Sequence, residues 1–159
     1  MEKIMTKLTY PGPTGATFSA LAYKEITPAE ILKTAMRLIR SARKTIRATM
    51  NAAEEIEHPL PREYFLLLPK KMAAGILVQR VGFGNKKDFS SIKDRIEINH
   101  PYYKFHRIGK RNYKRMLLID NSKLLFAKKE KGHNRYFYTE DKKLVGYYKK
   151  YFQACWKKK

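Results

Sequence analysis

Asn-Tyr-Lys-Arg-Met-Leu-Leu-Ile-Asp-Asn-Ser-Lys-Leu-Leu-Phe-Ala-Lys-Lys, residues 112–129, is the stretch of sequence that decides the fold. Residues 116–119 (Met-Leu-Leu-Ile) form a continuous apolar run, which is typical of a strand covered on both faces in the middle of an α/β sheet. The short polar side chains of residues 120–122 (Asp-Asn-Ser) favour a turn, because they form hydrogen bonds with the local backbone. The apolar pattern returns in residues 124–126 (Leu-Leu-Phe). The stretch therefore predicts a central β-hairpin.

A helix and a strand are predicted before this hairpin. Residues 27–30 (Thr-Pro-Ala-Glu) have the order of a helix start: a capping threonine, a proline in the first turn and a glutamate that completes a capping box. Apolar residues recur at helical spacing from Ile31 to Ala42, which predicts one buried stripe. Residues 45–50 then alternate as in a strand.

Several further elements are predicted around the hairpin. Residues 60–74 have the composition of a helix interrupted near Pro69, or of two short helices, with Gly75 at the end. Gly82 and Gly84 are predicted to end the strand that follows. Strands are predicted at residues 76–81, 102–108 and 134–139, a short helix within residues 88–98, and a closing helix with Thr139 as a possible cap.

This order of elements indicates an α/β layer architecture. We expect a single layered domain over residues 27–159, with a mixed sheet, flanking helices and a C-terminal helix. Residues 1–26 are predicted to be an arm or linker, because residues 11–15 (Pro-Gly-Pro-Thr-Gly) interrupt helices and strands alike. Residues 17–23 are a possible edge strand. No helix-turn-helix reader of DNA is evident in this arm.

The charge of the chain is strongly unbalanced. Lysine and arginine number 35 against 14 aspartate and glutamate residues, which gives a formal net charge of +21. Such an excess attracts polyanions, among which nucleic acid is the commonest candidate. The simpler interpretation is a basic surface that only keeps the protein soluble.

The remaining composition indicates a cytoplasmic globular protein. The chain is 43% hydrophobic, and Cys155 is its one cysteine, so it forms no internal disulfide and suits a reducing cytosol. No signal peptide or membrane span is predicted. His58, His100 and His133 lack ligand-like spacing to each other and to Cys155, so we expect no metal site and no cofactor.

The arrangement resembles one half of the phospholipase D superfamily. The capped helix that leads into residues 41–46 (Ser-Ala-Arg-Lys-Thr-Ile) resembles the family's opening helix and strand, and residues 74–78 (Ala-Gly-Ile-Leu-Val) resemble its second helix–strand step. The hairpin at residues 113–129 occupies the place of the catalytic motif His-x-Lys-x-x-x-x-Asp. The resemblance spans residues 27–156 and implies a phospholipase D-like α/β domain.

The catalytic motif itself is degenerate. Asp120 keeps the final aspartate, whereas Tyr113 stands in place of the nucleophilic histidine and Arg115 in place of the lysine. A phenol with a pKa near 10 is mostly protonated at neutral pH, so it replaces an imidazole nucleophile poorly. Arginine still binds phosphate in bidentate fashion. The site is therefore predicted to hold a phosphate without cleaving it.

The helix after residue 27 and residues 115–120 (Arg-Met-Leu-Leu-Ile-Asp) also resemble the sensor domain of TrmB-type archaeal transcription regulators, which shares this fold. The first hypothesis is thus a non-catalytic domain that binds nucleic acid through phosphates, with little sequence preference, in transcription or another DNA-associated process. The side chains expected to contact phosphate are Arg37, Arg40, Arg43, Lys110, Arg111, Lys114 and Arg115.

Two other functions are compatible with these residues. One is a phosphodiesterase or nuclease whose rebuilt site uses His106, Arg115 and Asp120. Because this family usually combines two motif copies in one active site, that reading requires a homodimer. A structural role is the simpler interpretation of His106, since a catalytic base needs the right geometry first. The other function is a sensor for a sugar or a phosphorylated metabolite.

Overall fold

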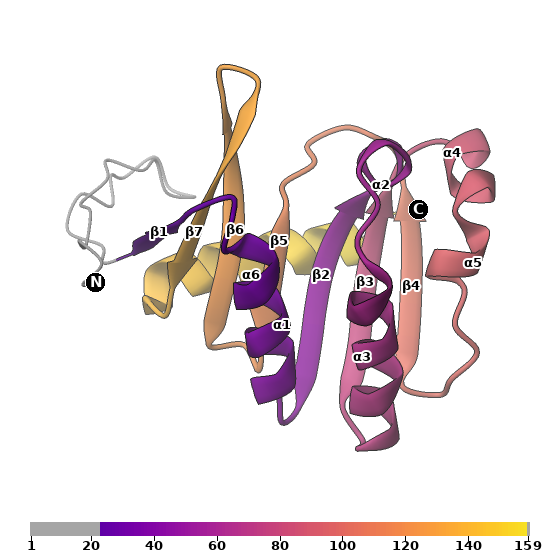
Figure 1. The fold of residues 1–159 in the computed structure, drawn as a ribbon, viewed down its shortest axis with the longest axis horizontal. Helices are drawn as coiled ribbons and strands as arrows, with labels where there is room; N and C mark the ends of the chain where they lie inside the picture. Colours follow the sequence, from indigo (N-terminus) through magenta and orange to yellow (C-terminus); the bar gives the residue numbers. More distant parts are fainter. Residues whose placement is uncertain (1–22, 159) are drawn as a thin grey trace.

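The computed structural model describes residues 23–158. In this part of the chain, seven strands form one mixed sheet in the order β1-β7-β6-β5-β2-β3-β4 (Figure 1). The strands are β1 (Lys24–Ile26), β2 (Thr45–Asn51), β3 (Leu77–Phe83), β4 (Tyr103–Ile108), β5 (Met116–Ile119), β6 (Lys123–Glu130) and β7 (His133–Thr139). The helices are α1 (Ile31–Ser41), α2 (Ala52–Glu57), α3 (Arg62–Ala73), α4 (Lys86–Ser91), α5 (Lys93–Ile96) and α6 (Lys142–Lys157).

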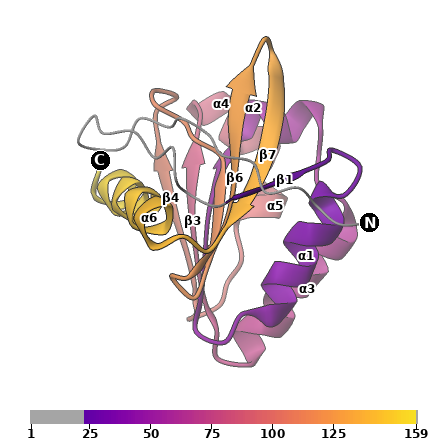
Figure 2. The ribbon, with the colours of Figure 1, turned by 90° about the vertical axis from the view of Figure 1, so that its left-hand side faces the viewer.

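The molecule has three layers. Helices α1 and α3 cover one face of the sheet, and α6 crosses the other face (Figure 2). Strands β2, β3 and β4 are parallel, and the remaining pairings are antiparallel. The predicted α/β layer architecture with a mixed sheet, flanking helices and a C-terminal helix is confirmed.

The predicted hairpin lies at the centre of the sheet. All four residues of β5 are buried, and β5 pairs with β2 on one side and β6 on the other. The turn places Asp120 at φ 53° and Asn121 at φ 58°, the left-handed region that short polar side chains tolerate best. Strand β7 then pairs with β6, so the hairpin belongs to a three-stranded meander.

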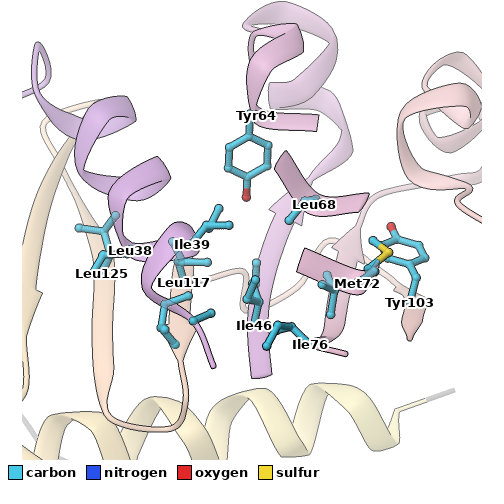
Figure 3. Close-up of a cluster of buried hydrophobic side chains, with 14 of the residues drawn as sticks. Leu38, Ile39, Ile46, Tyr64, Leu68, Met72, Ile76, Tyr103, Leu117 and Leu125 are labelled. Atoms are coloured by element: carbon cyan, nitrogen blue, oxygen red, sulfur yellow. The ribbon is translucent and has the colours of Figure 1, made fainter. Parts of the chain in front are cut away.

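Two apolar clusters lie on opposite faces of the sheet. On the α1–α3 face, Leu38 and Ile39 of α1 pack with Leu117 and Leu125 (Figure 3). On the α6 face, the largest buried side chains are aromatic: Tyr23, Phe83, Phe126, Phe137, Tyr148 and Phe152. Full burial of one such side chain stabilises the fold by about 1.5–3 kcal/mol.

Two predicted helix starts are wrong. The residues expected to start α1 form a turn in which the Glu30 N–H donates to the Thr27 carbonyl (3.0 Å), and the helix begins at Ile31. The same Thr-Pro order suits a turn, and here it carries the chain from edge strand β1 to the helix layer. Helix α6 is capped by Asp141, whereas Thr139 belongs to β7.

The glycine predictions have mixed outcomes. Residues 62–73 form one helix that contains Pro69, and Gly75 follows with φ 87°. The Gly75 and Ile76 N–H groups donate to carbonyls of the last turn, as in a Schellman motif, so Gly75 is confirmed as the helix end. Gly82 does not end β3. It lies inside the strand, where a Cβ would come within 2.5 Å of the Phe105 ring.

The region around residues 88–98 contains two short helices, α4 and α5, in place of one. The predicted arm and its possible edge strand lie almost entirely outside the described residues. Within the described part, β1 pairs with β7 and extends the sheet.

Candidate functional site

A cavity of about 280 Å³ lies on the α1–α3 side of the sheet, at the carboxyl ends of β2 and β3. Strand β2 has a parallel neighbour in β3 and an antiparallel neighbour in β5, so the strand direction changes here. Ligands of open α/β sheets bind outside the carboxyl ends of strands at such points. The charged side chains that line the cavity are Glu54, Glu55, Arg80 and Arg115.

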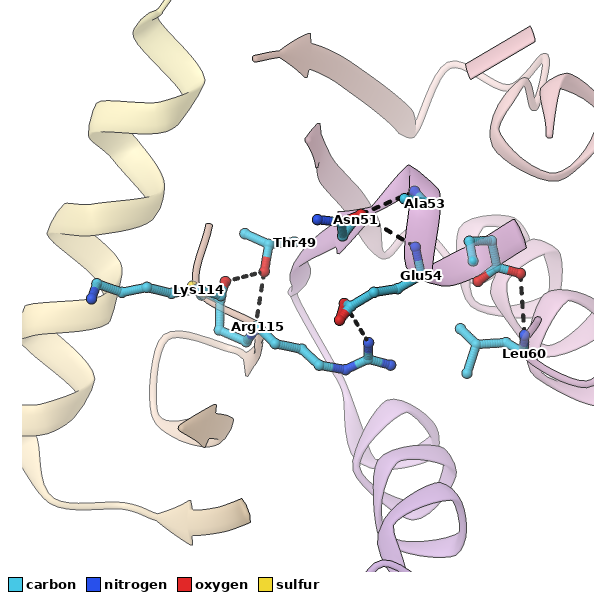
Figure 4. Close-up of polar contacts among 9 residues, drawn as sticks. Thr49, Asn51, Ala53, Glu54, Leu60, Lys114 and Arg115 are labelled. Carbon is cyan, nitrogen blue, oxygen red and sulfur yellow. Dashed lines mark hydrogen bonds and ion pairs between the residues drawn. The ribbon is translucent and has the colours of Figure 1, made fainter. Parts of the chain in front are cut away.

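The local backbone fixes the position of Arg115. The Thr49 hydroxyl donates to the Lys114 carbonyl (2.6 Å) and accepts from the Met116 N–H (3.0 Å), which ties both neighbours of Arg115 to β2 (Figure 4). The Arg115 guanidinium donates from Nη1 to Glu54 Oε1 at 3.5 Å. At this distance the ion pair is weak.

Helix α2 brings the two glutamates to the cavity. The Asn51 side chain caps the helix by accepting from the Ala53 N–H (2.9 Å) and the Glu54 N–H (3.2 Å). Glu55 is buried, and it accepts from the Leu60 N–H (3.1 Å) and from Arg95 Nη1 (3.4 Å). Burial raises the pKa of Glu55, although these donors and nearby arginines oppose the rise.

Arg80 is the most buried cation of the cavity, with 2% of its surface exposed. Its Nη1 donates to the Tyr103 hydroxyl at 3.4 Å, and its Nε has no hydrogen-bond partner among the described residues. The guanidinium lies 5.9 Å from the centres of the Phe65 and Phe105 rings, a cation–π distance. Sequence reasoning missed Arg80, because an arginine in an alternating strand is expected on the solvent side.

Tyr113 lies beside the cavity, in a second hollow that also contains Glu54 and Arg115. Its ring packs 5.0 Å from that of Phe83, and its buried hydroxyl has no hydrogen-bond partner among the described residues. Burial raises the pKa of Tyr113 well above 10. A phenolate nucleophile is therefore even less accessible here than in a free tyrosine.

The third residue of the degenerate motif lies elsewhere. Asp120 accepts backbone hydrogen bonds from Arg43 (3.0 Å), Lys44 (2.7 Å) and Thr45 (3.0 Å), at the opposite end of the sheet from Arg115. The length of β5 separates the two residues by roughly 15 Å. Burial alone would raise the pKa of Asp120, but these N–H donors lower it below its usual value. Asp120 therefore stabilises the turn and does not reach the cavity.

His106 is also remote from Arg115. It lies on β4, which β3 and β2 separate from β5. Its ring packs 5.7 Å from that of Trp156, and Nε2 contacts the Lys158 carbonyl. The rebuilt catalytic set of His106, Arg115 and Asp120 is therefore not assembled within one chain.

The predicted phosphate contacts are divided between different parts of the molecule. Arg37, Arg40 and Arg43 come from α1 and the turn after it, on one side of the sheet. Lys110 and Arg111 lie between β4 and β5, where Lys110 lies 3.9 Å from Asp88. The remaining two side chains diverge: Lys114 lies 5.9 Å from the Tyr151 ring of α6, and Arg115 lines the cavity.

A basic surface not included in the predicted set lies on α6. Lys143, Lys150 and Lys157 are exposed, and their seven-residue spacing places them along one side of the helix, away from its buried stripe. We call these three residues the α6 lysine row. The helix contains no acidic residue. Among residues 23–158 no ion pair is found for any lysine of the row. The seven-residue spacing was visible in the sequence.

Comparison with known proteins finds similarity at the level of the fold. No protein-family model matches the chain, and no curated protein is significantly similar in sequence. Among solved structures, TrmBL2, described as an archaeal chromatin protein with a novel mode of DNA binding, aligns with a TM-score of 0.63 and 12% identity over 80% of this chain and 48% of TrmBL2.

Two enzymes with phospholipase D-like folds align less closely. They are phosphatidylserine synthase of Haemophilus influenzae Rd KW20 (TM-score 0.50, 9% identity, 84% of this chain and 38% of that one) and polyphosphate kinase of Porphyromonas gingivalis (0.50, 9%, 82% and 22%). The chain spans less than half the length of each of the three structures. The phospholipase D-like fold is confirmed. No helix in residues 23–158 has the length and apolar character needed to cross a membrane.

Proposed function

We propose that this chain is a non-catalytic, phospholipase D-like domain that binds nucleic acid through phosphate contacts, with little sequence preference. The observation that carries the proposal is the exposed α6 lysine row, on a chain with a formal net charge of +21. The fold likeness to TrmBL2 adds support by analogy, because TrmBL2 is described as a DNA-binding chromatin protein. A role in transcription or another DNA-associated process would fit this analogy.

The geometry of the row suits a long polyanion. From Lys143 to Lys157 the helix rises about 21 Å, and a DNA duplex carries one charge per about 1.7 Å of its axis. Several phosphates can therefore lie opposite the row. Lysine acts as a point charge on phosphate and does not read base edges by itself, which accounts for the proposed lack of sequence preference.

Of the side chains first expected to bind phosphate, Lys114 fits this surface best. Its Nζ lies beside the Tyr151 ring of α6, so it would extend the lysine row toward the β4–β5 loop, where Arg111 is exposed. Arg37 and Arg40 belong to α1 on the other side of the sheet (Figure 2), so a straight duplex along α6 would not meet them. We assign them at most a secondary role.

The cavity side chains argue against phosphodiester cleavage. Tyr113 has a raised pKa, and Asp120 is engaged with the backbone at the other end of the sheet. A general base and a nucleophile must lie within hydrogen-bond reach of each other and of the substrate. Among the three residues of the degenerate motif, that condition is not met.

Binding to a labelled duplex of random sequence at about 50 and 200 mM salt tests the proposal. If each of the five side chains of this surface (the α6 lysine row, Lys114 and Arg111) contacts one phosphate, affinity should fall by about 10²–10³-fold over this range. The proposal predicts that the DNA stays intact on the same gel and that a second, unrelated sequence binds within a fewfold. An affinity that does not change with salt, or cut DNA, would contradict it.

A further inference from the structure

Arg80, the buried arginine of the cavity, takes no part in the proposed nucleic-acid surface on α6. A guanidinium carries five N–H donors, yet Arg80 makes one long hydrogen bond, to the Tyr103 hydroxyl at 3.4 Å. Its Nε is unpartnered within the described chain, and 98% of its surface is buried, since 2% is exposed. A buried charge is costly unless it is paired, and the described chain pairs Arg80 incompletely: the Phe65 and Phe105 rings lie 5.9 Å away, and Glu55 lies beyond ion-pair distance.

Each neighbouring carboxylate has one oxygen that already accepts a hydrogen bond. Glu55 accepts from the Leu60 N–H and from Arg95, and Glu54 lies against Arg115. No carboxylate lies within 4.0 Å of Arg80 in residues 23–158. Glu54 and Glu55 balance the charge of the two arginines, but neither pairs with Arg80, whose open N–H donors favour a ligand with an anionic acceptor over a cation.

The rest of the cavity wall is mainly apolar. Ile31, Leu32 and Ala35 line it from α1, and Leu117 and Leu125 line it from the sheet. A volume of about 280 Å³ is close to the lower end of small-molecule sites, which begin near 300 Å³. The space therefore suits a compact molecule that has an apolar body as well as a charged group.

We infer that this cavity binds a small organic anion, with a carboxylate or phosphate group on Arg80 and Arg115 and an apolar body against α1. The planar guanidinium fork matches both anionic groups, and burial strengthens the pairing because water competes less. The site lies on the face of the sheet opposite α6, so the ligand is distinct from the proposed nucleic acid. The inference does not depend on nucleic-acid binding.

Calorimetric titration and thermal unfolding with two simple acids test the inference. The probes are phenyl phosphate and 3-phenylpropionate, with the neutral 3-phenylpropanol as the matched control. About 150 mM salt screens the exposed lysines, so weak binding to the surface is suppressed. We expect at least one acid to bind and to raise Tm by several degrees near saturation, about 2–4 °C per kcal/mol for a chain of this size, and the alcohol to do neither. No binding of either acid at about 10 mM, or equal binding of the alcohol, would overturn the inference.

Two arginine variants locate the site. Arg80→Met replaces the arginine by an unbranched apolar side chain and so removes the charge. It should lower the affinity for the acid by about tenfold or more. Arg47→Met is the matched control: Arg47 lies on the adjacent strand, donates to Gln79 and Asn121, and does not line the cavity. Binding that survives Arg80→Met, or that falls equally in Arg47→Met, contradicts the inference.

A third variant keeps both arginines. Ala35→Phe on α1 narrows the cavity from its apolar side. Ala35→Phe should lower the affinity for each acid that binds, and it can be measured even if Arg80→Met proves too unstable to study. Unchanged binding in Ala35→Phe would place the acids outside this cavity and overturn the inference.

Discussion

The two ends of the central sheet use their polar side chains in opposite ways. At the turn after β5, the Asp120 carboxylate accepts three backbone N–H donors from residues 43–45. At the other end, Arg80 makes one long hydrogen bond and the Tyr113 hydroxyl makes none among the described residues. Tyr113 and Asp120 belong to the same degenerate motif, only seven positions apart.

The two ends of the motif therefore differ in what they contribute: one end contributes to stability and the other to function. A polar group whose hydrogen bonds are complete contributes to folding, and its removal is costly. A buried polar group with missing partners contributes little to folding, so a ligand that supplies those partners is the natural explanation for it. The expected effects of substitution therefore differ sharply between the two ends of the sheet.

The largest effect is expected at the turn. Asp120→Ala removes an ionised acceptor and leaves the N–H groups of residues 43–45 without it, so the free energy of unfolding should fall by about 2–3 kcal/mol. Urea denaturation at neutral pH measures the change. A loss below about 0.5 kcal/mol would mean that these hydrogen bonds do not support the fold.

The same carboxylate should give the stability a characteristic pH dependence. The pKa of Asp120 is lowered in the folded state relative to about 3.9 in the unfolded chain. Its contribution is therefore complete above the unfolded pKa and is lost as the pH falls through the folded pKa. Wild type and Asp120→Asn should differ most near neutral pH, and the difference should shrink as the pH falls through the lowered pKa of Asp120. A constant difference from pH 7 to 2 would contradict the assignment.

Arg80→Met should change stability far less than Asp120→Ala. Without ligand, the substitution replaces a poorly paired buried charge by an apolar side chain. The free energy of unfolding should therefore change by no more than about 1 kcal/mol, and it can increase. The control Arg47→Met loses hydrogen bonds to Gln79 and Asn121 and should cost about 1–2 kcal/mol. If Arg80→Met were the more damaging of the two, Arg80 would be a structural residue.

The smallest effect is expected at Tyr113. Its hydroxyl has no partner in the described chain, so Tyr113→Phe should leave stability unchanged or raise it by up to about 1 kcal/mol. Duplex binding should stay within twofold of wild type, since the phenol takes no part in the proposed surface. A clear loss of binding would return this residue to the functional site.

Much of the fold could be predicted from local patterns. The hairpin was predictable because residues 116–119 are uniformly apolar and residues 120–122 form turns readily. The start of α1 was not, because residues 27–30 suit a turn as well as a helix cap. The choice depends on how β1 pairs with β7, which no local pattern contains.

The site could be predicted only in part. Tyr113 and Arg115 were located through the catalytic motif, because they stand where its histidine and lysine are expected. The separation of Asp120 from the cavity, in contrast, follows from the length and direction of β5. Arg80 was missed, since its burial requires that rings from α3 and β4 cover it. The α6 lysine row needed no tertiary information, because helical periodicity alone places its members together.

The central claim is that the α6 lysine row binds nucleic acid through phosphates. Its most direct test is the salt dependence of duplex affinity for two triple variants of equal charge. One variant changes Lys143, Lys150 and Lys157 to Gln. The control changes Lys33, Lys70 and Lys86, which are exposed on α1, α3 and α4, to Gln.

Each phosphate contact adds about −0.9 to the slope of log K against log salt. We expect the α6 variant to make that slope shallower by about 2–3 and the control to keep it within about 0.5 of wild type. Equal losses of slope in the two variants would mean that the charge acts without a defined surface. A loss confined to the control would place the interface on the α1–α3 side and contradict the account.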